Sequence, residues 1–163
     1  MSNLNSINKN DEHNLKKIKV ESITLDNYIK DNDLDNILIK ADIEGGEVDL
    51  LLGGMDSLLS NKKISLLLEL HPSLYKDDMF KEVFIKLFNS GFKVIYVESA
   101  GSPQPFIFKN NSLKPVKIKN YRGLYQNLSN DFVIKYAFQE NNELIDDFTL
   151  FSKSIRSILI SKT

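Results

Sequence analysis

The spacing of apolar and polar residues along the chain predicts strands that alternate with helices. Short apolar runs and period-two alternation indicate strands, whereas apolar residues that recur every three or four positions indicate amphipathic helices. The predicted strands are residues 18–24, 36–42, 64–70, 92–97, a short segment at 105–109, and 131–138. The predicted helices are residues 25–29, 47–60, 79–88 and 144–158.

This order predicts an α/β domain over residues 18–163, with a mostly parallel sheet and helices on its faces. Strand, helix, strand, helix and strand follow one another with short connections, the arrangement that right-handed α/β units require. Residues 1–17 are polar and rich in Asn, so they cannot bury enough apolar surface to order themselves. We therefore expect a disordered leader before the domain.

The stretch NILIKADIEGGE, residues 36–47, is the centre of this organisation. Its Ile-rich first half predicts a strand buried on both faces, and Gly45 and Gly46 provide the turn into the next helix. Ligands of α/β sheets bind beyond the carboxyl ends of the strands. Asp42, Glu44 and Glu47 stand at that end, so this is the predicted site.

A second pair of polar residues closes the following strand. Glu69 and His71 stand at the end of residues 64–70, which we expect to pair with the central strand. Histidine exchanges a proton near neutral pH, so His71 is a candidate general base beside Asp42. The alternative is that His71 is an ordinary surface residue at a strand end.

Each candidate carboxylate also has a structural alternative. Asp42 either orients a substrate hydroxyl or caps the amides of the next helix. Glu44 and Glu47 either bind substrate or complement the helix dipole. Asp42, Glu44, Glu69 and His71 are also residue types that bind divalent cations, but their spacing does not require one, and no metal is predicted.

Composition narrows the function classes. The formal net charge is −1 and cysteine is absent, so disulfides and thiolate catalysis are excluded, and nothing overall indicates nucleic acid or membrane binding. A cytoplasmic protein is the expectation. Residues 98–130 do interleave cations with aromatic side chains, and we favour a solvated loop over an anion site there. These residues are Lys109, Lys114, Lys117, Lys119, Arg122, Phe106, Phe108, Tyr121 and Tyr125.

Four motifs resemble the FkbM-type methyltransferases. They are VESITLDNY at 20–28, IKADIEGGE at 39–47, LLGG at 51–54 and LLELH at 67–71. The resemblance covers residues 20–97. It implies S-adenosylmethionine as the cofactor, a Rossmann-like class I fold whose antiparallel last strand is residues 131–138, and O-methylation of a sugar or natural-product hydroxyl.

The resemblance also implies roles and partners. Asp42 and His71 become the catalytic candidates, and Glu44, Glu47 and Glu69 the substrate-binding ones. The Gly-rich cofactor half of the family is expected before Val20, where this chain has nineteen residues of mostly polar character, so we expect a truncated fold with most of the donor site absent. A small molecule or glycan would be the acceptor, and a complementing half or a second copy would cover the open edge of the sheet.

Two alternatives stay open. The chain is either active alone or dependent on a complementing half, and the sequence does not decide between them. A non-catalytic assembly or binding module derived from the same fold is the rival interpretation. A phospho-accepting receiver domain ranks below both, because its additional strand-end acids are not evident.

Overall fold

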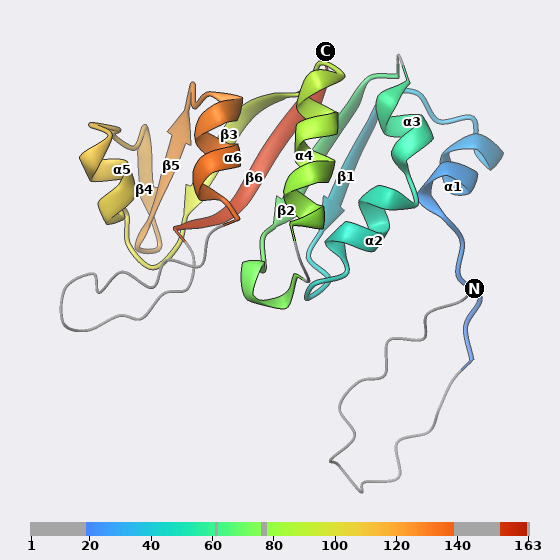
Figure 1. Ribbon diagram of the computed structural model, residues 1–163, viewed down its shortest axis with the longest axis horizontal. Coiled ribbons are helices and arrows are strands. Elements are labelled where there is room, and N and C mark those ends of the chain that lie inside the picture. The colour runs from blue at the N-terminus through green and yellow to red at the C-terminus, as the bar shows by residue number, and fades with distance from the viewer. Residues whose placement is uncertain (1–18, 61, 76–77, 139–153, 163) are drawn as a thin grey trace, which may run out of the picture.

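The computed structural model describes residues 19–60, 62–75, 78–138 and 154–162. They form a six-stranded sheet in the order β1-β2-β6-β3-β5-β4 (Figure 1). The strands are β1 (Ile37–Ala41), β2 (Ile64–Glu69), β3 (Lys93–Ser99), β4 (Lys117–Lys119), β5 (Arg122–Gln126) and β6 (Ile155–Lys162). The helices are α1 (Leu25–Asp31), α2 (Glu47–Leu52), α3 (Met55–Leu59), α4 (Met79–Asn89), α5 (Phe106–Asn110) and α6 (Asn130–Tyr136), with a 3₁₀ turn, η1 (Pro72–Leu74).

The α/β class is confirmed, but the prediction of a mostly parallel sheet is wrong. Only β1 and β2 pair in parallel, whereas β2–β6, β3–β6, β3–β5 and β4–β5 are antiparallel. The cause is β6, which enters from the end of the chain and lies between β2 and β3. As a result β2 and β3 point the same way without touching each other.

The predictions for the end of the chain are also corrected. Residues 131–138, expected as the last strand, lie in α6 and just beyond it, where the Ser129 hydroxyl accepts from the Phe132 amide as an N-cap. Residues 155–158, expected in a helix, belong to strand β6, and residues 144–153 of that predicted helix lie outside the described part. β6 buries Ile155, Ile158 and Ile160, β-branched residues that suit a strand hydrogen-bonded on both edges.

The segment before α1 is not a strand in its described part, residues 19–24. Val20 is 75% exposed, because no neighbouring strand pairs with this segment, and Thr24 instead caps α1 by accepting from the Asn27 amide. Asp26, in the first turn of α1, accepts from the Asp56 and Ser57 amides at the start of α3. The expected leader, residues 1–17, lies outside the described residues.

The single predicted helix over residues 47–60 is two helices, α2 and α3, separated by Gly53 and Gly54. A Cβ added at Gly54 would lie 2.5 Å from the Leu25 side chain, so this glycine allows α1 to pack closely.

The stretch after β3 is more ordered than the sequence suggested. Residues 105–109, expected as a short strand, include the start of α5, which follows Pro105 and buries Ile107 and Phe108. The following residues form the β4–β5 hairpin, which was expected as an irregular loop. Tyr125 of β5 is buried against Phe108, at 4.2 Å between ring centroids.

The main core lies between the sheet and its helices. In Figure 1, α3, α4 and α6 stand in front of the strands. Along β2 the residues Ile64, Leu66 and Leu68 are buried with the α4 side chains Phe84 and Leu87. The alternate β2 residues, which include Glu69, are half-buried on the opposite face.

β1 is an edge strand within the described sheet, not the central strand expected from the sequence. Leu38 is 65% exposed, so the prediction of burial on both faces is wrong for this strand. The Ile-rich run still pairs in register with β2, from Ile37 opposite Ile64 to Ala41 opposite Leu68. That register brings the carboxyl ends of β1 and β2 together.

Candidate active site

The turn after β1 brings acidic side chains to the end of the sheet. Asp42 follows the strand directly, and Glu44 takes a positive φ of 51° within the turn. Gly45 has φ +94°, and a Cβ there would lie 2.9 Å from the Cβ of Leu74 in η1. Only glycine tolerates that combination without strain, so the turn lies tightly against the segment that follows β2.

Glu47, the first residue of α2, accepts hydrogen bonds from the backbone of this turn. Its side chain is fully buried. One carboxylate oxygen accepts from the Ile43 amide and the other from the Gly45 amide, each at 3.0 Å. These are amides of the turn rather than of α2, and Asp42 does not cap that helix, whose N-cap residue is Gly46, without a side-chain cap hydrogen bond.

His71 lies over the same carboxylate. Its Nδ1 is 3.1 Å from Glu47 Oε1, and since a carboxylate accepts, Nδ1 carries the proton and donates. In the neutral ring this leaves Nε2 as the free acceptor. The arrangement is a carboxylate–imidazole pair, in which the buried acid fixes the tautomer and orientation of the ring.

Nε2 faces the remaining predicted acids. It is 3.9 Å from Asp42 Oδ1, 4.0 Å from Glu44 Oε2 and 3.9 Å from Glu69 Oε1. The four acids predicted from the sequence therefore gather around the imidazole of the fifth predicted residue, His71. A positive charge that forms on His71, or on a group bound beside it, would be stabilised by these carboxylates.

Tyr75 is a site residue that the sequence reasoning missed. Its hydroxyl accepts from the His71 amide at 2.7 Å. Burial raises the pKa of the Tyr75 hydroxyl well above its ordinary value, and the nearby Glu47 charge raises it further. Tyr75 therefore stays neutral beside Glu47. A tyrosine four residues after a strand-end histidine was the available indication.

Arg156, on β6, is the second residue that was missed. Its Nη2 lies 2.8 Å from Glu69 Oε1 and donates to Oε2 at 3.1 Å, while its Nε is 3.9 Å from Glu98 Oε2. Ser157 also donates to Glu98, at 2.8 Å. Arg156 is 87 residues from Glu69 in the chain, and its placement depends on β6, which the sequence did not predict.

Asp42, Glu69 and His71 also have the composition of a metal site, although none was predicted. One ligand atom from each lies within 4.8 Å of the others. Two carboxylates and one imidazole suit divalent transition metals. Arg156 already engages both oxygens of Glu69, so a metal ion would compete with a guanidinium for that carboxylate.

Comparison with known proteins identifies the family. The model of the methyltransferase FkbM domain matches residues 2–94, more than half of the chain. The chain belongs to the FkbM methyltransferase domain family. The expected resemblance is thereby confirmed. No curated protein matches this chain, and no solved structure matches it either.

The FkbM domain match includes every residue of the candidate site except Arg156. It spans β1, α2, β2 and α4, and therefore the Glu47–His71 pair and Tyr75. The mixed sheet is compatible with a methyltransferase-like fold. None of the helices in the described ranges is both long and apolar enough to cross a membrane.

The FkbM family is S-adenosylmethionine-dependent, so the glycine turn after β1 was tested as a place for that cofactor. A Cβ at Gly45 would meet Leu74, and one at Gly46 would meet the Ile43 side chain at 3.2 Å. The glycines thus face the protein's own side chains and do not fit as a cradle for a nucleoside. The acids around His71 instead suit the handling of a proton.

Proposed function

We propose that this chain is an S-adenosylmethionine-dependent O-methyltransferase in which His71, on the acceptor side, is the general base. The proposal rests on one observation: Glu47 holds His71 through Nδ1, so that Nε2 faces three carboxylates. The family match supports methyl transfer as the reaction class. The proposal includes a Rossmann-like fold for the part of the enzyme that binds the methyl donor.

The chemistry that these residues supply is proton transfer. An acceptor hydroxyl becomes a better nucleophile as its proton passes to His71 Nε2. The resulting imidazolium lies within 4.0 Å of Asp42, Glu44 and Glu69, whose charges stabilise it. Asp42, 39% exposed at the end of β1, is placed to orient the hydroxyl, whereas Glu44 is 79% exposed and contributes mainly charge.

Glu47 has a different role from the substrate contact that the sequence suggested. It is fully buried and surrounded by donors, so we assign it to positioning His71 and the turn of residues 43–45. Glu69 is 16% exposed and paired with Arg156, and its Oε1 also lies 3.9 Å from His71 Nε2.

The test is transfer of a tritiated methyl group from S-adenosylmethionine to hydroxyl acceptors by the purified full chain. The acceptor panel contains neutral sugars, sugar acids, sugar phosphates and natural-product alcohols. His71→Gln should lower the rate by about 10²–10⁴-fold, the usual contribution of a general base. The matched control is Glu82→Gln, an exposed residue of α4, which should behave like the parent.

Folding of each variant is checked by its cooperative thermal transition. Transfer at equal rates by the parent and His71→Gln would remove His71 from the mechanism. Failure of the parent to methylate any acceptor would favour the alternative, a binding module derived from the fold.

A further inference from the structure

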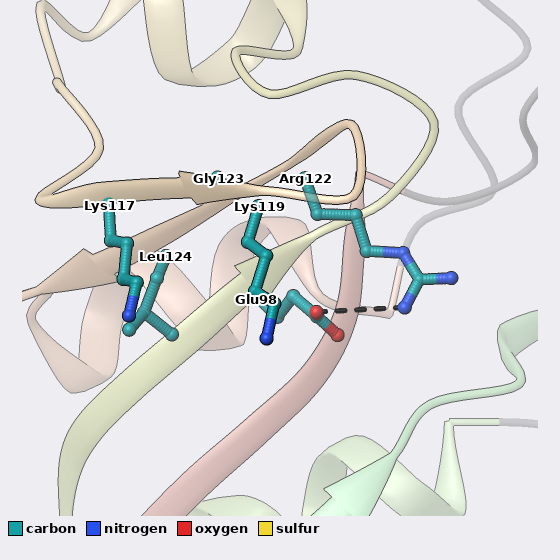
Figure 2. A pocket seen from close by; sticks show the side chains of 6 residues that line it. All are labelled: Glu98, Lys117, Lys119, Arg122, Gly123 and Leu124. Carbon is teal, nitrogen blue, oxygen red and sulfur yellow. Dashed lines mark ion pairs between the residues drawn. The ribbon is translucent and has the colours of Figure 1, made fainter.

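A cavity of about 240 Å³ lies on the face of the sheet that β3 and the β4–β5 hairpin form together. It is lined by Glu98, Lys117, Lys119, Arg122, Gly123 and Leu124 (Figure 2). Lys117 and Lys119 are two positions apart on β4, and Figure 2 shows both side chains projecting to the same side of the hairpin. We call this space the basic cavity.

The basic cavity has an excess of positive charge. Its lining has three cationic side chains and one carboxylate, a surplus of two positive charges. Glu98 is already engaged by Arg122, at 3.6 Å, and by the Ser157 hydroxyl. Among the described residues, no carboxylate lies within ion-pair distance of Lys117 or Lys119. These two ammonium groups are therefore available to a ligand.

The strand register connects the basic cavity with the candidate active site. Lys117 is paired with Leu124, Leu124 with Glu98, and Glu98 with Ser157. Ser157 is in turn paired with Glu69, which lies 3.9 Å from His71 Nε2. Paired residues project from the same face of a sheet, so one row of side chains runs from Lys117 to Glu69.

Ion pairs follow the same path as the register. Arg156 joins Glu69 to Glu98, and Arg122 joins Glu98 to the hairpin. The carboxylates along this row are thus already matched by guanidinium groups, and the unmatched positive charge is concentrated at the hairpin end. The row crosses four strand-to-strand spacings, roughly 19 Å between the outer backbones, so a ligand that meets the imidazole at one end and the two lysines at the other is longer than a monosaccharide.

We propose that the basic cavity binds an anionic group of the acceptor, a phosphate or a carboxylate, while its hydroxyl lies at His71. This rests on the proposed function, because it assumes that the acceptor approaches His71. Lysine and arginine bind both groups through charge-assisted hydrogen bonds. The acceptor class is then an oligosaccharide that ends in a phosphate or a uronate rather than an uncharged oligosaccharide.

Binding is tested separately from methyl transfer by calorimetric titration of the full chain. The probes are an oligosaccharide that ends in a phosphate, an oligosaccharide that ends in a uronate, inorganic phosphate and an uncharged oligosaccharide of the same length. We expect one of the two charged oligosaccharides to bind, more weakly as salt is raised, and the uncharged oligosaccharide not to bind. The double variant Lys117→Gln/Lys119→Gln should weaken this binding about tenfold, as expected for two exposed ion pairs.

The matched control is Lys109→Gln/Lys114→Gln, which removes two exposed lysines of the same region from outside the cavity. This control should bind like the parent. The proposal is overturned if no charged sugar binds, if the Lys117/Lys119 variant binds as well as the parent, or if inorganic phosphate alone binds. The last result would assign the cavity to a free ion.

Kinetics distinguish failure of the cavity from failure of the proposed function. With a charged acceptor, the Lys117/Lys119 variant should raise KM and leave kcat unchanged, because the lysines bind a part of the acceptor that does not react. Equal KM values would overturn the cavity assignment and leave His71 as the base. Lysine-dependent sugar binding without any methyl transfer would overturn the proposed function and leave the cavity.

Discussion

The two ends of one row of side chains handle charge in opposite ways. At the β1–β2 end, the acids around His71 have partners within the protein, and the buried Glu47 accepts from two backbone amides and from the His71 imidazole. At the hairpin end, Lys117 and Lys119 face a cavity, with no ion-pair partner among the described residues.

This difference separates positioning from binding. A carboxylate with every lone pair satisfied makes its neighbours rigid, which a general base requires. An ammonium group without a partner gains by taking up an anion from solution. Variants at the acidic end should therefore change turnover and stability, whereas variants at the hairpin should change acceptor affinity.

Among variants that keep the proposed base, the largest effect should come from Glu47→Gln. The amide keeps the shape but loses the charge that fixes the His71 tautomer, so kcat should fall on the order of 10²-fold or more. The pH–rate profile should shift as well, because the imidazolium loses its nearest carboxylate. A loss of about 2 kcal/mol in the free energy of unfolding should accompany this, the scale of one charged hydrogen bond.

Glu44→Gln is the matched control for Glu47, since its side chain is 79% exposed. Its unfolding free energy in urea should stay within about 0.5 kcal/mol of the parent. If Glu47→Gln were as stable as Glu44→Gln and kept the parent's pH–rate profile, Glu47 would have no positioning role.

An intermediate effect is expected from zinc. Zn²⁺ binds imidazole and carboxylate groups, so it should occupy Asp42 and His71 Nε2 and slow methyl transfer about tenfold or more. A chelator should restore the rate but leave the untreated enzyme unchanged. Asp42→Asn should weaken the inhibition, because the amide is a poorer ligand. Loss of activity when untreated enzyme meets the chelator would instead identify the cluster as a working metal centre.

The sequence was sufficient for the β1–β2 end because its contacts are local. Glu47 and His71 are 24 residues apart, and the apolar run of β1 and the glycine turn indicate where each side chain emerges. At this end, however, the sequence analysis predicted a catalytic role for Asp42 and only substrate binding for Glu47. Burial decides the role of Glu47, and burial follows from how η1 closes over the turn.

The hairpin end depends on pairings that the sequence pattern does not contain. β6 pairs with both β2 and β3, and its residue Arg156 contacts Glu69, which lies 87 residues earlier in the chain. The apolar spacing of β6 was equally compatible with a helix. Lys117 and Lys119 were noticed only as part of a mixed stretch of cations and aromatics. The register of β4 and β5 places them beside Glu98, while Phe108 and Tyr125 turn inward as core.

The smallest predicted effect concerns one tyrosine at each end, the half-buried Tyr75 beside Glu47 and the buried Tyr125 of strand β5. Burial raises the pKa of Tyr125 to about 12, and the pKa of Tyr75 is raised as well. Because an unfolded tyrosine ionises near pH 10, the folded state keeps protons that the unfolded state releases. Their contribution to stability is complete below about pH 10 and is lost as the pH rises toward 12.

Tyr125→Phe isolates the hairpin tyrosine. The variant loses the hydroxyl's hydrogen bond to the Pro103 carbonyl, 2.8 Å, so at neutral pH it should be less stable by about 1 kcal/mol. The variant also lacks the hydroxyl that ionises at high pH. The difference in unfolding free energy between parent and variant should therefore narrow as the pH rises above about 10. Urea unfolding across that range measures the gap. A gap that stays constant would mean that Tyr125 ionises equally in both states, and that burial does not protect it.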